Sequence, residues 1–149
     1  EVKKAIKSIP VVASGDLFSP EDIKKCLDQT GVDGVLIARG FIGNPWIISR
    51  TLEYLRTGSL SPEPSFEDRI EMLFKHTFKT IVFKGEHRGM REMRRFNNQY
   101  IKGFPGAAEL RQKINQADTF EDLKNIFKNL SFPVANLQKI LQPELIPAH

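Results

Sequence analysis

The chain has 149 residues, of which 40% are hydrophobic and 27% charged, and its formal net charge is +4. This composition is typical of a globular protein and argues against a disordered chain, and the length fits one ordinary domain or two small ones. No apolar run is long enough to cross a membrane, and the first residues, EVKKAIKSIP, lack the apolar core of a secretory signal. We therefore expect a cytoplasmic protein without a membrane partner.

The first part of the sequence predicts alternating strands and helices. IPVVASG, residues 9–15, is apolar on both faces and ends in glycine, which is typical of a buried parallel strand. SPED, residues 19–22, combines an N-cap, a proline at the first helical position and acids in the first turn, so a helix should cover 20–29. DGVLIAR, residues 33–39, is a second buried strand, and a proline opens a helix over 45–57. This order is the repeating unit of an α/β fold.

A change of composition marks a domain boundary. GSLSPEPS, residues 58–65, contains one Gly, two Pro and three Ser, as linkers commonly do. The sequence after it predicts an all-α bundle, with helices at 65–84, 87–102, 105–116 and 119–130. The predicted domains are 1–60 and 61–130, followed by a proline-interrupted tail, 131–149, for which the sequence predicts no structure.

Two glycine-bearing loops follow the predicted strands, and the carboxyl ends of parallel strands lie on the same rim of a sheet. Glycine lets the backbone approach a phosphate, arginine adds a bidentate contact, and the helix opening near Pro45 would aim its N-terminus at the anion. A purely structural rim stays an alternative, as does a turn or capping role for the aspartate. The candidate residues are Ser14, Gly15, Asp16, Ala38, Arg39 and Gly40.

Basic residues concentrate in one segment. Between Lys84 and Lys113 there are eight Lys or Arg and three Glu, a local net charge of +5, so the other 119 residues sum to about −1. At about 100 degrees per residue, four of these cations form a stripe roughly 60 degrees wide on one helix, opposite its apolar side. Such a stripe is usually a solvated face, but a side this basic favours a nucleic-acid backbone partner. The predicted contacts are Arg88, Arg91, Arg94, Arg95, Lys102, Arg111 and Lys113.

Cysteine and histidine usage predicts neither a disulfide nor a metal site. Cys26 is the single cysteine, and His76, His87 and His149 are too scattered for a zinc cluster. Cys26 lies in a predicted helix, facing away from the strand ends, so we expect no nucleophile there.

Two segments together resemble a known family. IPVVASGDLFSPEDIKKCLDQTGVDGVLIARGFIGNPWI resembles the end of the flavin barrel of bacterial tRNA-dihydrouridine synthases. GMREMRR and NQYIKGFPGAAELRQKINQADTFEDL resemble the C-terminal helical domain of that family, which generic flavin barrels lack. The matches follow the family's order and cover about residues 8–130. The resemblance implies an α/β plus all-α fold: the last two βα units of a TIM (β/α)8 barrel followed by a helical bundle.

The resemblance also implies a cofactor site and a reaction. The two loops would grip the phosphate of FMN, with contacts from Ser14, Gly15, Asp16, Ala38, Arg39 and Gly40. The family usually has Asn where Ser14 stands and Gly where Ala38 stands. The implied reaction is the NADPH-dependent reduction of the C5–C6 bond of a uridine in tRNA, with a hydride from FMN and a proton from a cysteine. That cysteine is expected upstream and is not Cys26, so we expect this chain to be a fragment without catalytic residues of its own.

Two other functions stay open. A flavin oxidoreductase acting on a small molecule would keep the barrel, but the basic helices argue against it. A non-catalytic RNA-binding module would use the helices alone. That alternative is disfavoured because the chain would contain only a quarter of a barrel, whose open strand edges and apolar faces need to be covered. Binding of tRNA in a gel shift separates the first alternative from the tRNA enzyme.

Overall fold

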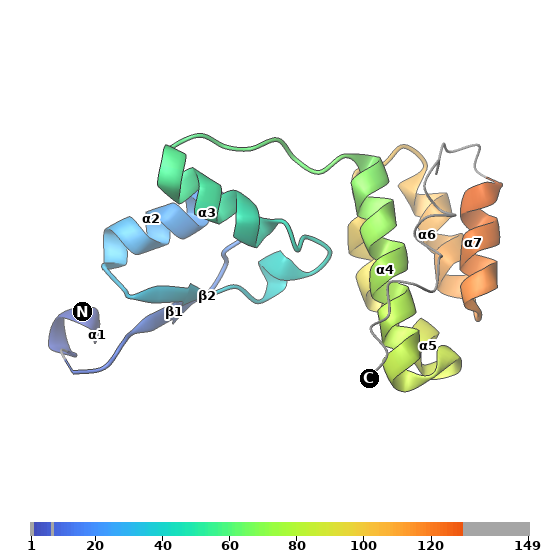
Figure 1. The fold of residues 1–149 in the computed structure, drawn as a ribbon, viewed down its shortest axis with the longest axis horizontal. Helices are drawn as coiled ribbons and strands as arrows, with labels where there is room; N and C mark the ends of the chain where they lie inside the picture. Colours follow the sequence, from blue (N-terminus) through green and yellow to red (C-terminus); the bar gives the residue numbers. More distant parts are fainter. Residues whose placement is uncertain (1, 7, 130–149) are drawn as a thin grey trace. The chain divides into compact units, whose positions relative to one another are not determined.

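The computed structural model describes residues 2–6 and 8–129. The chain divides into two compact units, one ending at Glu63 and the other beginning at Pro64 (Figure 1). The predicted tail, 131–149, lies outside the described residues. Within the described ranges, no helix is long and apolar enough to cross a membrane, and no cluster of His, Cys, Asp and Glu could hold a metal ion.

The first unit alternates strands and helices, as the sequence predicts. Its two strands pair in parallel, with Val12 opposite Gly34 and Ser14 opposite Leu36. In Figure 1, α2 and α3 lie on the same side of the strands. Since α2 connects two parallel strands, it forms the crossover of a βαβ unit. The elements are α1 (Val2–Ala5), β1 (Val12–Ser14), α2 (Pro20–Thr30), β2 (Gly34–Leu36), the 3-10 turn η1 (Arg39–Phe41) and α3 (Ile47–Thr57).

Helix α2 begins at the signal that the sequence contains. The backbone N–H of Asp22 donates to the Ser19 hydroxyl at 3.1 Å, and the N–H of Ser19 donates to the Asp22 carboxylate at 3.0 Å. The hydrogen bond with the Ser19 side chain, followed by bonds from the backbone, lowers the pKa of Asp22. Gly31, with φ 65°, ends the helix in the left-handed conformation that favours glycine. Local sequence therefore determines both ends of α2.

The prediction of strands buried on both faces is wrong for this part of the chain. Val35 packs against the core that includes Ile23 and Ile47. On the opposite face of the sheet, Val12 and Leu36 are 59% and 60% exposed. The strands are also shorter than predicted, with three residues each. The apolar residues on the open face of the strands would be buried only if a second layer of structure packed on that face. The described residues do not provide such a layer.

The second unit consists of helices, and the four predicted helices are confirmed within a few residues at their ends. Capping boxes at Ser65 and Thr119 begin the first and the last of them. In the core, the ring of Phe74 stands edge-on to that of Phe127, with centroids 5.3 Å apart. The helices are α4 (Phe66–Lys84), α5 (Glu86–Tyr100), α6 (Ala107–Gln116) and α7 (Phe120–Lys128).

His76 connects α4 to α5 through aromatic contacts. Its Nδ1 lies 3.2 Å from the Tyr100 hydroxyl, and its ring centroid lies 5.3 Å from that of Phe96. Burial lowers the pKa of His76 and raises the pKa of Tyr100 to about 12. Burial therefore favours the neutral imidazole beside a protonated phenol.

We expect the free energy of unfolding to fall as the pH drops below neutrality. Below the ordinary histidine pKa of about 6.5, the unfolded chain binds a proton that folded His76 resists. Neutral His76 makes its full contribution to the free energy of unfolding above that pH. The contribution is lost as the pH falls through the lowered pKa that His76 has in the folded state. Urea titrations at about pH 7.5 and about pH 5.5 measure the difference. His76→Gln should reduce this difference in the free energy of unfolding, whereas His87→Gln, at an exposed position, should leave it unchanged. An equal pH difference in both variants would contradict the assignment of the effect to His76.

Candidate functional site

The two glycine loops meet where β1 and β2 end. Because the strands are parallel and Ser14 lies opposite Leu36, both carboxyl ends reach the same edge of the sheet. The loops enclose a hollow of about 190 Å³, which we call the strand-end hollow. All six loop residues selected from the sequence line it, together with Leu17, Phe18 and Leu36: Ser14, Gly15, Asp16, Ala38, Arg39 and Gly40.

An ion pair joins the two loops. Nη2 of Arg39 donates to Oδ1 of Asp16 at 2.5 Å, and the two side chains are 74% and 77% exposed. The Arg39 guanidinium also lies 5.8 Å from the centroid of the Phe18 ring. Asp16 has φ 44°, and no other non-glycine residue in the described parts of the chain has a positive φ. Unfavourable backbone conformations of this kind concentrate at functional sites.

The glycines of the two loops have different roles. Gly40 is buried where the loops touch: a Cβ there would lie 1.9 Å from the Leu17 carbonyl oxygen and 3.1 Å from the Phe18 Cα. Gly15 has φ 134°, and a Cβ there would meet nothing within 4 Å. Gly40 therefore permits the contact between the loops, and Gly15 leaves its backbone open to a ligand.

The polar groups of the strand-end hollow suit an anion. Gly15, Asp16 and Ala38 place backbone N–H groups in the two loops that line the hollow. Ser14 is exposed, so its hydroxyl is accessible, and Arg39 supplies a guanidinium. Free N–H groups, a hydroxyl and a guanidinium are the donors that bind phosphate in proteins. Asp16 is the single acidic residue of the lining, and its carboxylate is the group that does not suit an anion.

The helix expected to open at Pro45 does not reach this hollow. Turn η1 begins three residues after the end of β2, at Arg39, and α3 begins only at Ile47. Neither Asn44 nor Pro45 lines the hollow. The prediction that this helix aims its N-terminus at the anion is therefore wrong, because η1 and the bend after it separate the helix from the end of the strand.

Four predicted RNA contacts are exposed cations with no acidic partner among the described residues: Arg91, Arg95, Lys102 and Arg111. Arg91 and Arg95 lie four residues apart on α5, so they share one face of the helix. The Arg95 guanidinium lies 4.6 Å from the centroid of the Phe96 ring. Lys102 lies beyond the end of α5, in the turn that leads to α6.

Glu92 changes the expected charge of the polar side of α5. Its carboxylate accepts from Nζ of Lys84 at 2.5 Å and from Nε of Arg88 at 3.1 Å. These hydrogen bonds, that from Lys84 first, lower the pKa of Glu92. The prediction of an almost purely basic side is therefore wrong near Arg88, where a carboxylate beside the stripe neutralises charge.

Two further predicted RNA contacts also have acidic partners. Nη2 of Arg94 donates to Asp118 at 2.8 Å, and Nζ of Lys113 lies 2.7 Å from Glu109. Exposed ion pairs are weak, typically about 1 kcal/mol or less, so these cations stay accessible to a phosphate. The cations without acidic partners are nevertheless the better candidates for strong contacts.

Arg69, which no pattern in the sequence indicates as functional, binds the end of helix α5. Its Nη2 donates to the carbonyl oxygens of Gln99 and Lys102, at 3.1 and 2.8 Å. Arg69 thus binds one carbonyl in the last turn of α5, that of Gln99, and one in the turn that follows the helix, that of Lys102. The carbonyl partners lie thirty or more positions away in the sequence, so no local pattern indicated this contact.

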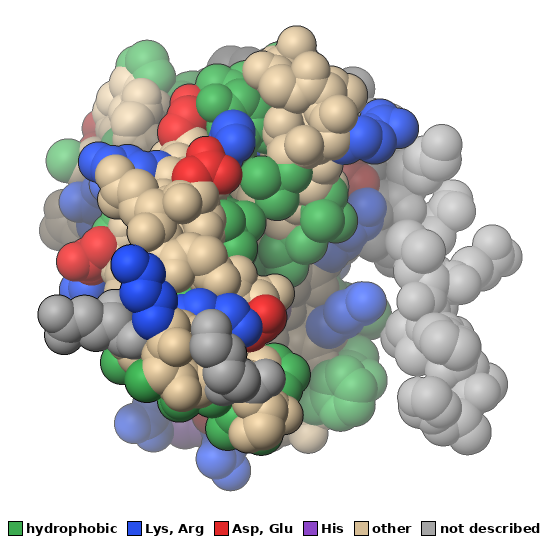
Figure 2. Space-filling view, turned by 90° about the vertical axis from the view of Figure 1, so that its left-hand side faces the viewer, with side chains coloured by type: hydrophobic (Ala, Val, Ile, Leu, Met, Phe, Trp, Pro, Cys, Tyr) green, Lys and Arg blue, Asp and Glu red, His purple; other side chains and the backbone are tan. Residues whose placement is uncertain are grey.

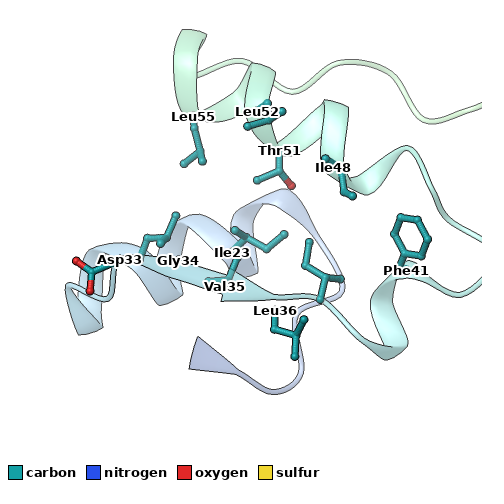
Figure 3. A pocket seen from close by; sticks show the side chains of 12 residues that line it. Ile23, Asp33, Gly34, Val35, Leu36, Phe41, Ile48, Thr51, Leu52 and Leu55 are labelled. Atoms are coloured by element: carbon teal, nitrogen blue, oxygen red, sulfur yellow. The ribbon is translucent and has the colours of Figure 1, made fainter. Parts of the chain in front are cut away.

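A second hollow, of about 470 Å³, lies between β2 and α3 and has an almost entirely apolar lining. We call it the apolar groove. Ile48, Leu52 and Leu55 of α3 lie over β2, with Phe41 near one end (Figure 3). Leu52 is 64% exposed. Figure 2 likewise shows hydrophobic side chains at the surface of one face of the molecule. Large exposed apolar patches commonly mark surfaces that another segment or protein covers.

Comparison with known proteins identifies the family. The sequence model of the dihydrouridine synthase (Dus) family matches residues 1–137. The chain therefore belongs to the dihydrouridine synthase family. The family resemblance seen in the two sequence segments is confirmed.

Three relatives show how much of the family's length is present. A probable tRNA-dihydrouridine synthase of Rickettsia bellii is 37% identical over 114 residues, which are 76% of this chain and 35% of that protein. The tRNA-dihydrouridine synthase B of Pseudomonas aeruginosa is 40% identical over 115 residues, 77% of this chain and 34% of that protein. A probable tRNA-dihydrouridine synthase 1 of Synechocystis is 34% identical over 126 residues, 85% of this chain and 35% of that protein. The matched part of the chain thus spans about a third of the length of these relatives.

Proposed function

We propose that this chain is part of an FMN-dependent, NADPH-driven tRNA-dihydrouridine synthase, an oxidoreductase that reduces uridine in tRNA. The observation that carries the proposal is the strand-end hollow, in which two glycine-bearing loops and the Arg39 guanidinium come together. The relatives named tRNA-dihydrouridine synthase support the substrate. In this function the chain contributes phosphate-binding loops and a helical tRNA-binding domain, and the rest of the active site belongs to a longer protein.

The residues of the strand-end hollow would hold the phosphate of FMN. The guanidinium of Arg39 and the Ser14 hydroxyl would donate hydrogen bonds to the phosphate, and backbone N–H groups of the two loops would add further donors. FMN, once reduced by NADPH, supplies the hydride for the uridine. Cys26 packs against the core of the first unit, as a structural cysteine does, so the proton donor belongs elsewhere.

The proposed fold of the longer protein is a TIM barrel that ends with these two βα units. The parallel pairing of β1 and β2 with a helical crossover agrees with this arrangement. Val12 and Leu36 on the open face of the sheet, and the apolar groove beside α3, are surfaces that further barrel elements would cover. In this proposal residues 1–60 belong to the barrel and residues 61–130 form the tRNA-binding domain.

The helical unit would bind the tRNA backbone. Arg91, Arg95, Lys102 and Arg111 are exposed and have no acidic partner among residues of the described ranges, so each is available to a phosphate. A uridine must leave its stack to reach a cofactor in a protein pocket. Contacts with the tRNA backbone would supply the binding energy that offsets this unstacking.

A non-catalytic RNA-binding module is the second candidate. It is favoured by the compactness of the second unit, whose core is built around Phe74 and Phe127 within its own helices. Such a module would bind RNA without flavin. The experiment that distinguishes the candidates is therefore a measurement of flavin content.

The intact mass and visible absorbance of the natural gene product test the proposal. The 114 matched residues are 35% of the Rickettsia bellii relative, which gives that protein about 330 residues, roughly twice the length of this chain. We expect a product of that size that carries bound FMN and reduces unmodified tRNA in the presence of NADPH. A colourless product that still shifts tRNA in a gel would instead support the non-catalytic module.

A further inference from the structure

The strand-end hollow contains one acid, and it is paired with the one base. We infer that Asp16 competes with the ligand anion for Arg39: its carboxylate occupies the guanidinium until a phosphate monoester displaces it. This inference rests on the proposed function, because it concerns the phosphate end of the same cofactor site. It assigns to Asp16 a role opposite to that of a flavin contact.

The charges of the lining support competition. Asp16 and Arg39 are the only charged residues among those that line the hollow, and their atoms lie 2.5 Å apart. A carboxylate offers the same acceptor geometry to a guanidinium as a phosphate does. Arg39 therefore cannot offer the same N–H groups to both, and a carboxylate left beside a bound phosphate repels it.

The exposure of the pair makes the exchange feasible. Both side chains are about three-quarters exposed, at 74% and 77%, so an entering ligand reaches them directly. Exposed ion pairs are weak, because water solvates both partners. The pair is therefore strong enough to orient Arg39 across the hollow and weak enough for a phosphate dianion to replace.

The backbone at Asp16 also indicates that its side chain has a function. With φ 44°, the position favours glycine or asparagine, and most side chains are strained there. Aspartate is tolerated in this conformation better than most residues, but asparagine would be tolerated as well without the negative charge. Asp16→Asn thus removes the charge while it keeps the shape and the backbone preference.

The test measures dissociation constants of FMN and of riboflavin for the apo form of the natural gene product, by quenching of flavin fluorescence. Riboflavin lacks the phosphate, so it reports contacts with the ring and the ribityl chain only. We expect Asp16→Asn to bind FMN about fivefold more tightly, which is the change in affinity expected from one exposed ion pair. The dissociation constant of riboflavin should be unchanged. Glu53→Gln, which removes an exposed acid on α3, is the matched control and should change neither constant.

Arg39→Gln completes a double-mutant cycle. This variant should weaken FMN binding and leave riboflavin binding unchanged, and Asp16→Asn added to it should give a much smaller gain than in the unmodified protein. Weaker or unchanged FMN binding by Asp16→Asn would overturn the inference, and so would an equal gain for riboflavin or an undiminished gain in the Arg39→Gln background. If the unmodified protein binds neither flavin, the flavin site itself is wrong, and the inference fails with it.

Discussion

Gly40→Ala should destabilise the first unit by about 3 kcal/mol, the upper range for overpacking a closed site. The added methyl carbon would lie 1.9 Å from the Leu17 carbonyl oxygen, and backbone atoms of Leu17 and Phe18 surround it. These atoms belong to the other loop of the strand-end hollow, so the strain cannot be relieved by rotating a side chain. The loops must separate, and the phosphate-binding geometry should be lost together with the stability.

Urea unfolding of the chain, followed by tryptophan fluorescence, measures this effect, because the single tryptophan, Trp46, lies in the first unit. Gly34→Ala is the matched control: a Cβ there would meet only a Val12 methyl group, at 3.9 Å. We expect that variant to change stability by less than about 1 kcal/mol, the span of strand propensities. If Gly40→Ala were as stable as Gly34→Ala, the close contact between the loops would not exist in solution.

Local signals in the sequence predicted the elements, because the interactions that begin and end them are local. The hydrogen bonds between Ser19 and Asp22, and the left-handed conformation of Gly31, connect residues a few positions apart. The order of the elements and the placement of both glycine loops at one edge follow from parallel pairing. This is why all six loop residues selected from the sequence lie in one hollow.

Several of the predictions that failed concern partners from other elements. Lys84 belongs to α4, so the sequence of α5 alone could not show that Glu92 binds both Lys84 and Arg88. The pairing of Asp16 with Arg39 joins loops 23 positions apart. Burial of Val12 likewise depends on a covering layer, and a strand cannot encode what packs against it. Contacts between distant segments can be recognised only in the structure, whereas helix caps and hydrophobic periodicity can be recognised in the sequence.

The two glycine loops and the basic helix α5 depend on different properties of their residues. A phosphate site needs fixed donors at short distance, so it depends on backbone geometry at Gly40 and Gly15. Contacts with a nucleic-acid backbone depend mostly on charge and reach, so flexible side chains on one helix face suffice. Substitutions should therefore affect flavin content through the loops and tRNA affinity through the cations.

Reversing the charge of Arg91 and Arg95 to Glu should weaken tRNA binding by the natural gene product at least about tenfold at low salt. Both residues are exposed on one face of α5, and neither has an acidic partner in the described part of the chain. Each arginine contact with a phosphate that is lost lowers the number of counterions that the tRNA releases on binding. The slope of log affinity against log salt should therefore become shallower by about 1 to 2. Flavin content should stay unchanged, because the strand-end hollow contains neither residue.

A matched double reversal separates a specific contact from net charge. Lys25 and Arg56 are exposed residues of the first unit, on α2 and α3, and changing both to Glu alters the total charge by the same amount. If tRNA binding depends on the face of α5, Lys25→Glu/Arg56→Glu should retain most of the affinity and the original salt slope. Equal weakening by both pairs would mean that overall charge alone attracts the tRNA. Undiminished binding by Arg91→Glu/Arg95→Glu would remove this face from the tRNA site, leaving Lys102 and Arg111 as the cations to test next.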